Sequence, residues 1–263
     1  MYAIIFHAHQ KLDRVAHRHL NMLDPNQFFP SISKILKFEG GHGPDGAKLK
    51  RQKNGEQPWH FVDPADSQDT KLDKQIKHHY EQLVKELSNK DEVRAAFEAA
   101  WLAHALVDGL TPAHHYPYEK ELEELRGGED RNTRNGLAGR LYVKGDTMTS
   151  SIKQSLKLVG PGGLLTSHAM FEAGAYTLIA PLTLKKAMPS KAEIRNMNKL
   201  GVVKTFRQAV EEIAEMDIFN RFMTIGWTQT LSQEVRRELA PRMVKMITLA
   251  WYSASLEAQK VKS

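Results

Sequence analysis

Residues 100–115 read AWLAHALVDGLTPAHH, an apolar helical run interrupted by His104 and Asp108. These two residues are four positions apart, so they lie on one face of the predicted helix with Cβ atoms about 5–6 Å apart. An imidazole and a carboxylate that are buried there need partners, because polar groups without them are costly to bury. A metal ion would satisfy both, and so would a simple His–Asp hydrogen bond. A pair this short, taken alone, favours the hydrogen bond.

A second apolar segment repeats the pattern. Residues 162–180 read GGLLTSHAMFEAGAYTLIA, and they place His168 and Glu172 four positions apart in another helical run. Two such pairs in one chain favour a metal site over two separate core hydrogen bonds.

The remaining composition restricts what could bind. The chain has no cysteine, so thiolate zinc fingers, iron–sulfur clusters and cysteine nucleophiles are excluded, and any metal must be held by His, Asp and Glu. Zinc accepts neutral imidazoles and carboxylates in shells of low coordination number. Further candidate ligands are Asp45 and His60 in a Gly-containing basic stretch and four histidines near the N-terminus: His7, His9, His17 and His19. His42 and the pair His78 and His79 have no partner at useful spacing, and we expect them at the surface.

The chain of 263 residues predicts an all-α protein. Strand-type alternation is scarce, and no proline-rich or low-complexity linker divides the sequence, so we expect residues 1–263 to form a single multi-helix domain. Helical periodicity marks 9–23, 30–38, 72–89, 91–109, 147–158, 163–180, 203–216 and 228–260.

The ordered set of motifs resembles the bacterial zinc-dependent phospholipases C and the single-strand-specific zinc nucleases that share their fold. His104, Asp108, Pro112 and His114 reproduce a central HxxxDxxxPxH element. His168 and Glu172 match the HxxxE element of the phospholipases, where the nucleases have HxxxD. Upstream, Asp45 and the phrase HFVDP at residues 60–64 match a loop Asp that precedes an HF-x-DP phrase. The match spans residues 9–175.

This resemblance implies a helical bundle around two or three zinc ions. One ion would be held by His60, His104, Asp45 and Asp108, and Asp108 would bridge to a second ion shared with His9. The remaining ion would be held by His114, His168 and Glu172. His9 fits the family's N-terminal ligand because it precedes Asp45 by 36 positions, while His19 lies on the same helical face and is the reserve.

The chain departs from the family pattern in four places, two of which are Val107 where the family has Gly and Thr111 where it has Gln. It begins Met1-Tyr2, where the family has a terminal Trp that completes one metal site, so either that metal is missing or His7 replaces the terminal amine. Residues 126–146 contain a Gly- and Arg-rich stretch that we interpret as an inserted loop.

The resemblance implies a phosphodiester hydrolase of the phospholipase C type, with phospholipid or another phosphodiester as substrate and Asp45 as both ligand and general base. The phrase PDG at residues 44–46 could equally be only a turn. One alternative is a nuclease or other phosphodiesterase on the same scaffold, in which Tyr116 and Tyr118 stack on bases or line a pocket. Another is a non-catalytic helical protein with a degenerate metal site.

Charge and hydropathy add little to this choice. The net charge of +6 suits anionic partners such as nucleic acid, a phospholipid surface or a phosphorylated metabolite. We expect no transmembrane segment, because the most apolar stretch, 159–184, contains Pro161, His168, Glu172 and Pro181. The N-terminus lacks a signal-peptide pattern, so we expect a cytoplasmic protein if residue 1 is the native start and a secreted one if a leader has been removed.

Overall fold

The computed structural model describes residues 2–39, 43–49, 59–125, 128, 143 and 147–261. Within these residues the chain is helical, and no strand occurs among them, which confirms the all-α prediction. The helices are α1 Tyr2–Leu23, α2 Ile32–Ile35, α3 Pro44–Leu49, α4 Lys71–Asn89, α5 Glu92–Gly109, α6 Tyr118–Leu125, α8 Met148–Val159, α9 Leu164–Ile179, α10 Lys191–Leu200, α11 Val202–Ala214, α12 Ile218–Ile225, α13 Gln229–Glu234 and α14 Ala240–Lys260. None of the described helices is both long and apolar enough to cross a lipid bilayer.

Helix α5 is the central element of the bundle. It begins after Asp91, whose side chain accepts hydrogen bonds from the backbone N–H groups of Val93 and Arg94 and so satisfies two free donors of the first turn. Six buried alanines give the helix a narrow profile, which lets neighbouring helices approach closely: Ala95, Ala96, Ala99, Ala100, Ala103 and Ala105. Helix α5 is therefore buried on almost every side from Ala95 to Gly109.

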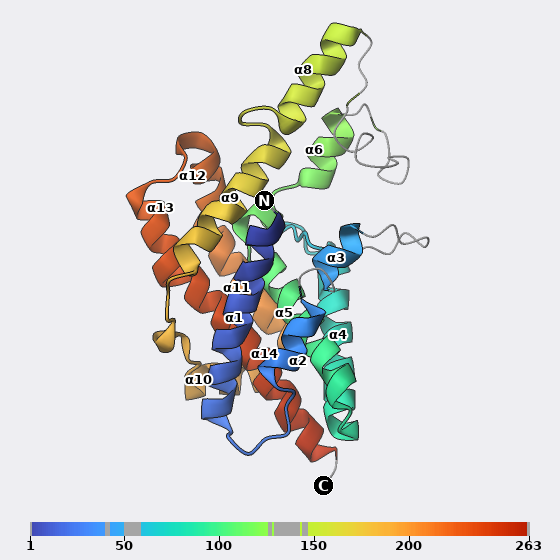
Figure 1. The fold of residues 1–263 in the computed structure, drawn as a ribbon, viewed down its shortest axis with the longest axis vertical. Coiled ribbons are helices and arrows are strands. Elements are labelled where there is room, and N and C mark those ends of the chain that lie inside the picture. The colour runs from blue at the N-terminus through green and yellow to red at the C-terminus, as the bar shows by residue number, and fades with distance from the viewer. Residues whose placement is uncertain are drawn as a thin grey trace.

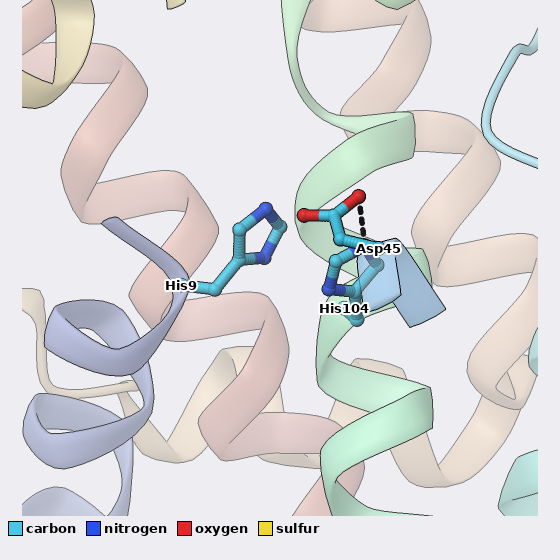
Figure 2. A group of neighbouring side chains, drawn as sticks. All are labelled: His9, Asp45 and His104. Carbon is cyan, nitrogen blue, oxygen red and sulfur yellow. Dashed lines mark ion pairs between the residues drawn. The ribbon is translucent and has the colours of Figure 1, made fainter. Parts of the chain in front are cut away.

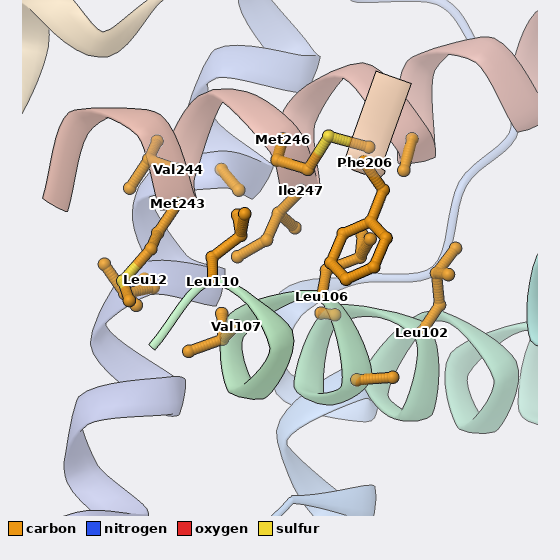
Figure 3. Close-up of a cluster of buried hydrophobic side chains, with 14 of the residues drawn as sticks. Leu12, Leu102, Leu106, Val107, Leu110, Phe206, Met243, Val244, Met246 and Ile247 are labelled. Carbon is orange, nitrogen blue, oxygen red and sulfur yellow. The ribbon is translucent and has the colours of Figure 1, made fainter. Parts of the chain in front are cut away.

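Long helices enclose α5. Helices α1, α4 and α14 lie alongside it in Figure 1, and the close-up in Figure 3 shows the apolar side chains of α1, α5, α11 and α14 meeting between them. The indole N–H of Trp251 in α14 donates to the backbone carbonyl of Ala99 at 3.1 Å, which joins the two helices at the centre of the core. A Cβ added at Gly109 would lie 2.4 Å from Phe206 and 2.7 Å from Leu72, so glycine is required where α5 ends between α4 and α11.

The two ends of the molecule carry different helices. Figure 1 shows α8 and α6 projecting at one end, beside the N-terminus, while the C-terminus of α14 lies at the opposite end. Helix α9 packs against α1 and follows α8 directly in the chain. The start of α1, the end of α5 and the first half of α9 therefore meet in the same part of the bundle.

The predicted helix over 228–260 is interrupted. The structure has α13, a π-helical segment at Val235–Leu239, and then α14 with Pro241 in its first turn. Proline has no backbone N–H, and its ring clashes with the preceding turn of an α-helix. The wider π turn accommodates Pro241, so the helical segment continues from α13 into α14.

Other departures from the predicted pattern are local. Helix α1 begins at Tyr2 rather than at residue 9, and α3, α6, α10 and α12 were not predicted because each is short. The prediction that His79 lies at the surface is wrong. His79 is buried, and its Nδ1–H donates to Glu98 at 2.7 Å, whereas His78 is exposed. His42, which was also predicted to lie at the surface, is outside the described residues.

Candidate metal centre

Asp108 is the centre of a buried group of histidines. It lies in the last turn of α5, and its Oδ2 atom is 3.3 Å from Nε2 of His104, one turn earlier on the same helical face. Both side chains are almost completely buried. The spacing in the sequence therefore places an imidazole and a carboxylate together inside the bundle, as the pattern predicts.

Three further histidines reach the same carboxylate from other elements. Nε2 of His9 in α1 lies 3.4 Å from Oδ1 of Asp108, and Nδ1 of His114 lies 3.9 Å from it. The Nδ1–H of His60, in the segment before α4, donates to Oδ2. Burial raises the pKa of Asp108, but the surrounding imidazoles outweigh this effect, so the pKa lies well below its usual value.

His9, Asp45 and His104 form one group of possible metal ligands, drawn in Figure 2. The rings of His9 and His104 are stacked, with centroids 4.1 Å apart and an interplanar angle of 11°. Asp45 comes from the first turn of α3, and its Oδ1 is 3.7 Å from Nε2 of His104. Asp45 is thus part of a helix that aims its carboxylate at the cluster, and it is not merely a turn residue.

His9 and not His19 reaches the cluster. His19 is also buried, but it lies further along α1 and hydrogen-bonds to the backbone of Ala187. Burial lowers the pKa of both side chains. The hydrogen bond to the backbone of Ala187 explains why His19 is a core residue. His9 is therefore the N-terminal candidate ligand. The side chain of His7 lies outside the described part of the structure.

A second group of possible ligands consists of His60, His104 and Asp108. Burial lowers the pKa of His104, but the carboxylates of Asp108, Glu39 and Asp45 outweigh it and hold the pKa well above the usual value. A positive charge is therefore strongly favoured at this point. A proton supplies it in the chain alone, and a metal ion would supply it in the same place.

His114, His168 and Glu172 form the third group, at the half-buried edge of the cluster. Nε2 of His114 and Nε2 of His168 lie 3.1 and 3.0 Å from the same oxygen of Glu172, and they are 3.3 Å from each other. Burial raises the pKa of Glu172, but the two imidazoles outweigh it and bring the pKa well below its usual value. Helix α9 supplies two of these ligands, and the short 3-10 turn after α5 supplies the third.

The donor atoms fit a divalent metal ion. Zinc lies about 2.0–2.1 Å from nitrogen and oxygen ligands, so two ligands of one tetrahedral ion stand about 3.3 Å apart. The three separations of 3.0, 3.1 and 3.3 Å in the third group are close to that value. In the other two groups the candidate donor atoms lie within 4.8 Å of one another. These buried groups of His, Asp and Glu could hold metal ions.

Two buried carboxylates beside the cluster were not predicted. Glu39 accepts a hydrogen bond from Nδ1–H of His104 at 3.3 Å, and it thereby directs the Nε2 atom toward Asp45 and Asp108. Nothing in the sequence around Glu39 signals this role. Partners of this kind orient a metal-binding histidine and raise its basicity.

Asp13 is the other buried carboxylate. It follows His9 by four positions on α1, which is the same spacing as in the other His–carboxylate pairs and could have identified it. Neither carboxylate oxygen of Asp13 has a hydrogen-bond partner in the described part of the chain. Burial raises the pKa of Asp13 well above its usual value, and the nearby Glu39 raises it further.

A small pocket of about 40 Å³ lies beside the cluster. Its polar lining is His9, Asp108, Thr111, Glu172 and Tyr176, and apolar side chains such as Leu12, Val107 and Phe171 form much of its wall. The share of liquid volume per water molecule is about 30 Å³, so the pocket has room for one small polar group next to Asp108.

Several predicted features lie outside the described residues. They include the basic side chains after Asp45 and most of the stretch 126–146 that we interpret as an insertion. Tyr116 is described: its ring meets Phe219 edge-on at 5.9 Å, and both line a pocket of about 390 Å³ with His115. The side chain of Tyr118 is not described.

Comparison of the chain with protein-family models, with curated proteins and with solved structures found no match.

Proposed function

We propose that this protein is a zinc-dependent phosphodiester hydrolase of the phospholipase C type. The observation that supports the proposal most strongly is that eight His, Asp and Glu side chains, Asp108 among them, gather from six separate segments into one largely buried cluster. These residues are His9, Asp45, His60, His104, Asp108, His114, His168 and Glu172.

These residues would hold two or three zinc ions, and Asp108 would be shared between two of them. Zinc ions bound there would polarise phosphoryl oxygens, activate water and stabilise the leaving oxygen of an in-line displacement. His104 and His60 approach Oδ2 of Asp108, while His9 and His114 approach Oδ1. The two oxygens of Asp108 thus face different ligands, which is what a bridging carboxylate requires.

Asp45 is the residue we assign as general base. Its side chain is 15% exposed, against 5% for Asp108, so water and substrate can reach it. Helix α3 holds its carboxylate next to His104 at the margin of the cluster. In this position Asp45 accepts a proton from the attacking water at a carboxylate oxygen, while the other ligands remain fixed in the core.

The test is hydrolysis of bis-p-nitrophenyl phosphate by zinc-loaded protein. We expect turnover that a chelator removes, and a loss of at least about 100-fold in kcat for Asp45→Asn, because general-base contributions are typically of this size. Asp66→Asn is the matched control, since Asp66 is an exposed carboxylate in the segment after His60 and its turn hydrogen bond to Gln68 survives as Asn. Full turnover by Asp45→Asn would overturn its assignment as the base.

A nuclease on the same scaffold is the second candidate. The net charge of +6 and the aromatic wall formed by Tyr116 and Phe219 favour it, because bases stack on aromatic side chains. Parallel assays with phosphatidylcholine and with a single-stranded oligonucleotide separate the two substrates. Zinc binding without turnover of either substrate, or of bis-p-nitrophenyl phosphate, would instead indicate a non-catalytic metal protein.

A further inference from the structure

Helix α8 exposes an apolar stripe that none of the described elements covers. Four of its large apolar side chains are between 39% and 83% exposed: Met148, Ile152, Leu156 and Val159. At about 100° per residue these positions fall within an arc of about 80°, so they form one continuous face. Contiguous exposed apolar surface of this kind marks a binding surface in a water-soluble fold.

The helix that carries the stripe is well formed. Thr147 and Ser150 make a reciprocal capping box at its start, which satisfies two free backbone donors. At its end, the hydroxyl of Thr166 in α9 donates to the carbonyl of Val159 at 2.9 Å and fixes the corner between the two helices. An adjacent face of α8 buries Ser151 and Leu158, and α9 is the main neighbour of the helix. The exposed stripe is thus the outer face of a helix anchored by α9.

The charge on α8 indicates what the stripe contacts. Lys153 and Lys157 are exposed on the face next to the apolar stripe, and the sequence of α8 contains no acidic residue. A helix with an apolar face flanked by lysines has the pattern of segments that lie in the boundary between lipid headgroups and acyl chains. Its positive charge complements anionic lipids.

We propose that α8 docks the protein onto an anionic lipid surface, with Ile152 and Leu156 entering the headgroup boundary and Lys153 and Lys157 contacting lipid phosphates. Figure 1 shows α8 projecting beyond the helices that enclose α5. Helix α9, which carries His168 and Glu172, starts immediately after the corner. Docking would therefore hold the metal-ligand end of the bundle toward the lipid. The inference goes beyond the proposed hydrolase activity and does not depend on it.

The experiment is co-sedimentation of the full chain with vesicles of phosphatidylcholine containing phosphatidylglycerol, compared with phosphatidylcholine alone. We expect binding to the anionic vesicles that weakens as salt increases. The double variant Ile152→Asn/Leu156→Asn should weaken partitioning by about tenfold or more, because two large side chains leave the interface. A separate double variant, Lys153→Gln/Lys157→Gln, should weaken partitioning by about fivefold per lysine, because each substitution removes a charge that attracts anionic lipid.

The matched control is Met22→Asn/Val93→Asn. It removes two exposed apolar side chains that are distant from α8 in the chain and are 71% and 59% exposed, and it should leave partitioning unchanged. Circular dichroism checks the fold of each variant, and bis-p-nitrophenyl phosphate turnover, read separately, should not differ between wild type and the α8 variants. Failure to bind anionic vesicles, or equal binding by Ile152→Asn/Leu156→Asn and wild type, would overturn the proposal. A dimer in analytical ultracentrifugation that this variant abolishes, without vesicle binding, would assign the stripe to a second copy of the chain instead.

Discussion

Helix α5 carries two buried carboxylates, and their surroundings differ. Glu98, near its start, accepts from Nδ1–H of His79 at 2.7 Å and from Arg94 at 3.0 Å, one partner for each oxygen. Asp108, near its end, has ion pairs with four histidines, and no Lys or Arg among the described residues pairs with it. The same helix thus carries one carboxylate that is fully paired with protein side chains and another that lies among possible metal ligands.

The comparison shows what separates a core hydrogen bond from a candidate metal centre. At Glu98 an arginine, which is always charged, balances the carboxylate, and the histidine completes its hydrogen bonding. At Asp108 the described partners are imidazoles, whose protons a metal ion can displace. A divalent ion would satisfy Asp108, Asp45 and the facing histidines together, whereas Glu98 needs nothing more.

The largest expected effect is that of Asp108→Asn. The amide has only one acceptor oxygen and no charge, so we expect loss of at least one zinc ion per chain and a fall in kcat/KM of about 1000-fold or more toward a phosphodiester. Zinc analysis of zinc-loaded, desalted protein measures the first effect. Glu98→Gln is the control and should keep its zinc. Equal zinc content in Asp108→Asn and wild type would remove the distinction between the two carboxylates.

Glu98→Gln should instead affect stability. It removes the charge that pairs with Arg94 and weakens the bond to His79, and bonds to charged groups contribute about 1.5–3 kcal/mol each. We expect the free energy of unfolding to fall by about 2 kcal/mol in urea titrations, with zinc content and turnover unchanged. A stable Glu98→Gln protein that had lost zinc would show that Glu98 belongs to the metal centre.

Glu39→Gln tests the hydrogen bond that Glu39 accepts from His104. Loss of a carboxylate that accepts from a metal-binding histidine typically weakens metal affinity by about 10–100-fold. We expect a rise of that size in the zinc dissociation constant, measured by competition with a chromogenic chelator. Glu92→Gln is a matched control, because that carboxylate is paired with Lys34 away from the cluster. Wild-type affinity in Glu39→Gln would mean that the bond to His104 is only structural.

Asp13→Asn should have the smallest effect, and it has a pH signature. Burial raises the pKa of Asp13 above 3.8, so the folded chain keeps a proton that the unfolded chain releases. By linkage, this group makes metal-free protein less stable as pH rises above that value, until the folded pKa is passed. Asparagine does not titrate, so Asp13→Asn should be more stable than wild type by about 1 kcal/mol at pH 8 and similar to it at pH 4.

Urea unfolding of metal-free protein at the two pH values measures this difference. Asp24→Asn, at a partly exposed residue away from the cluster, serves as control. A variant that is less stable than wild type at pH 8 would contradict a protonated, buried Asp13.

The sequence predicted the helices that bury a long apolar face, because their periodicity is repeated over several turns. It did not predict α10 or α12, which have too few turns for a clear pattern, or the π segment that Pro241 imposes. For the site, the spacing of His104 and Asp108 was informative because a helix fixes which residues share a face.

Glu39 and the burial of His79 could not be predicted in this way. Each depends on a contact with a residue distant in the chain: Glu39 with His104, and His79 with Glu98. Such contacts are set by how the helices pack and not by local spacing.

The most direct test of the central claim is zinc stoichiometry. Untagged protein would be loaded with zinc, desalted, and assayed for zinc by inductively coupled plasma mass spectrometry and for protein by quantitative amino-acid analysis. We expect two or three zinc ions per chain, with wild-type stoichiometry in Glu98→Gln and a deficit in Asp108→Asn. A wild-type protein that retains no zinc would contradict it, and the histidines around Asp108 would then be core hydrogen-bonding groups like His79.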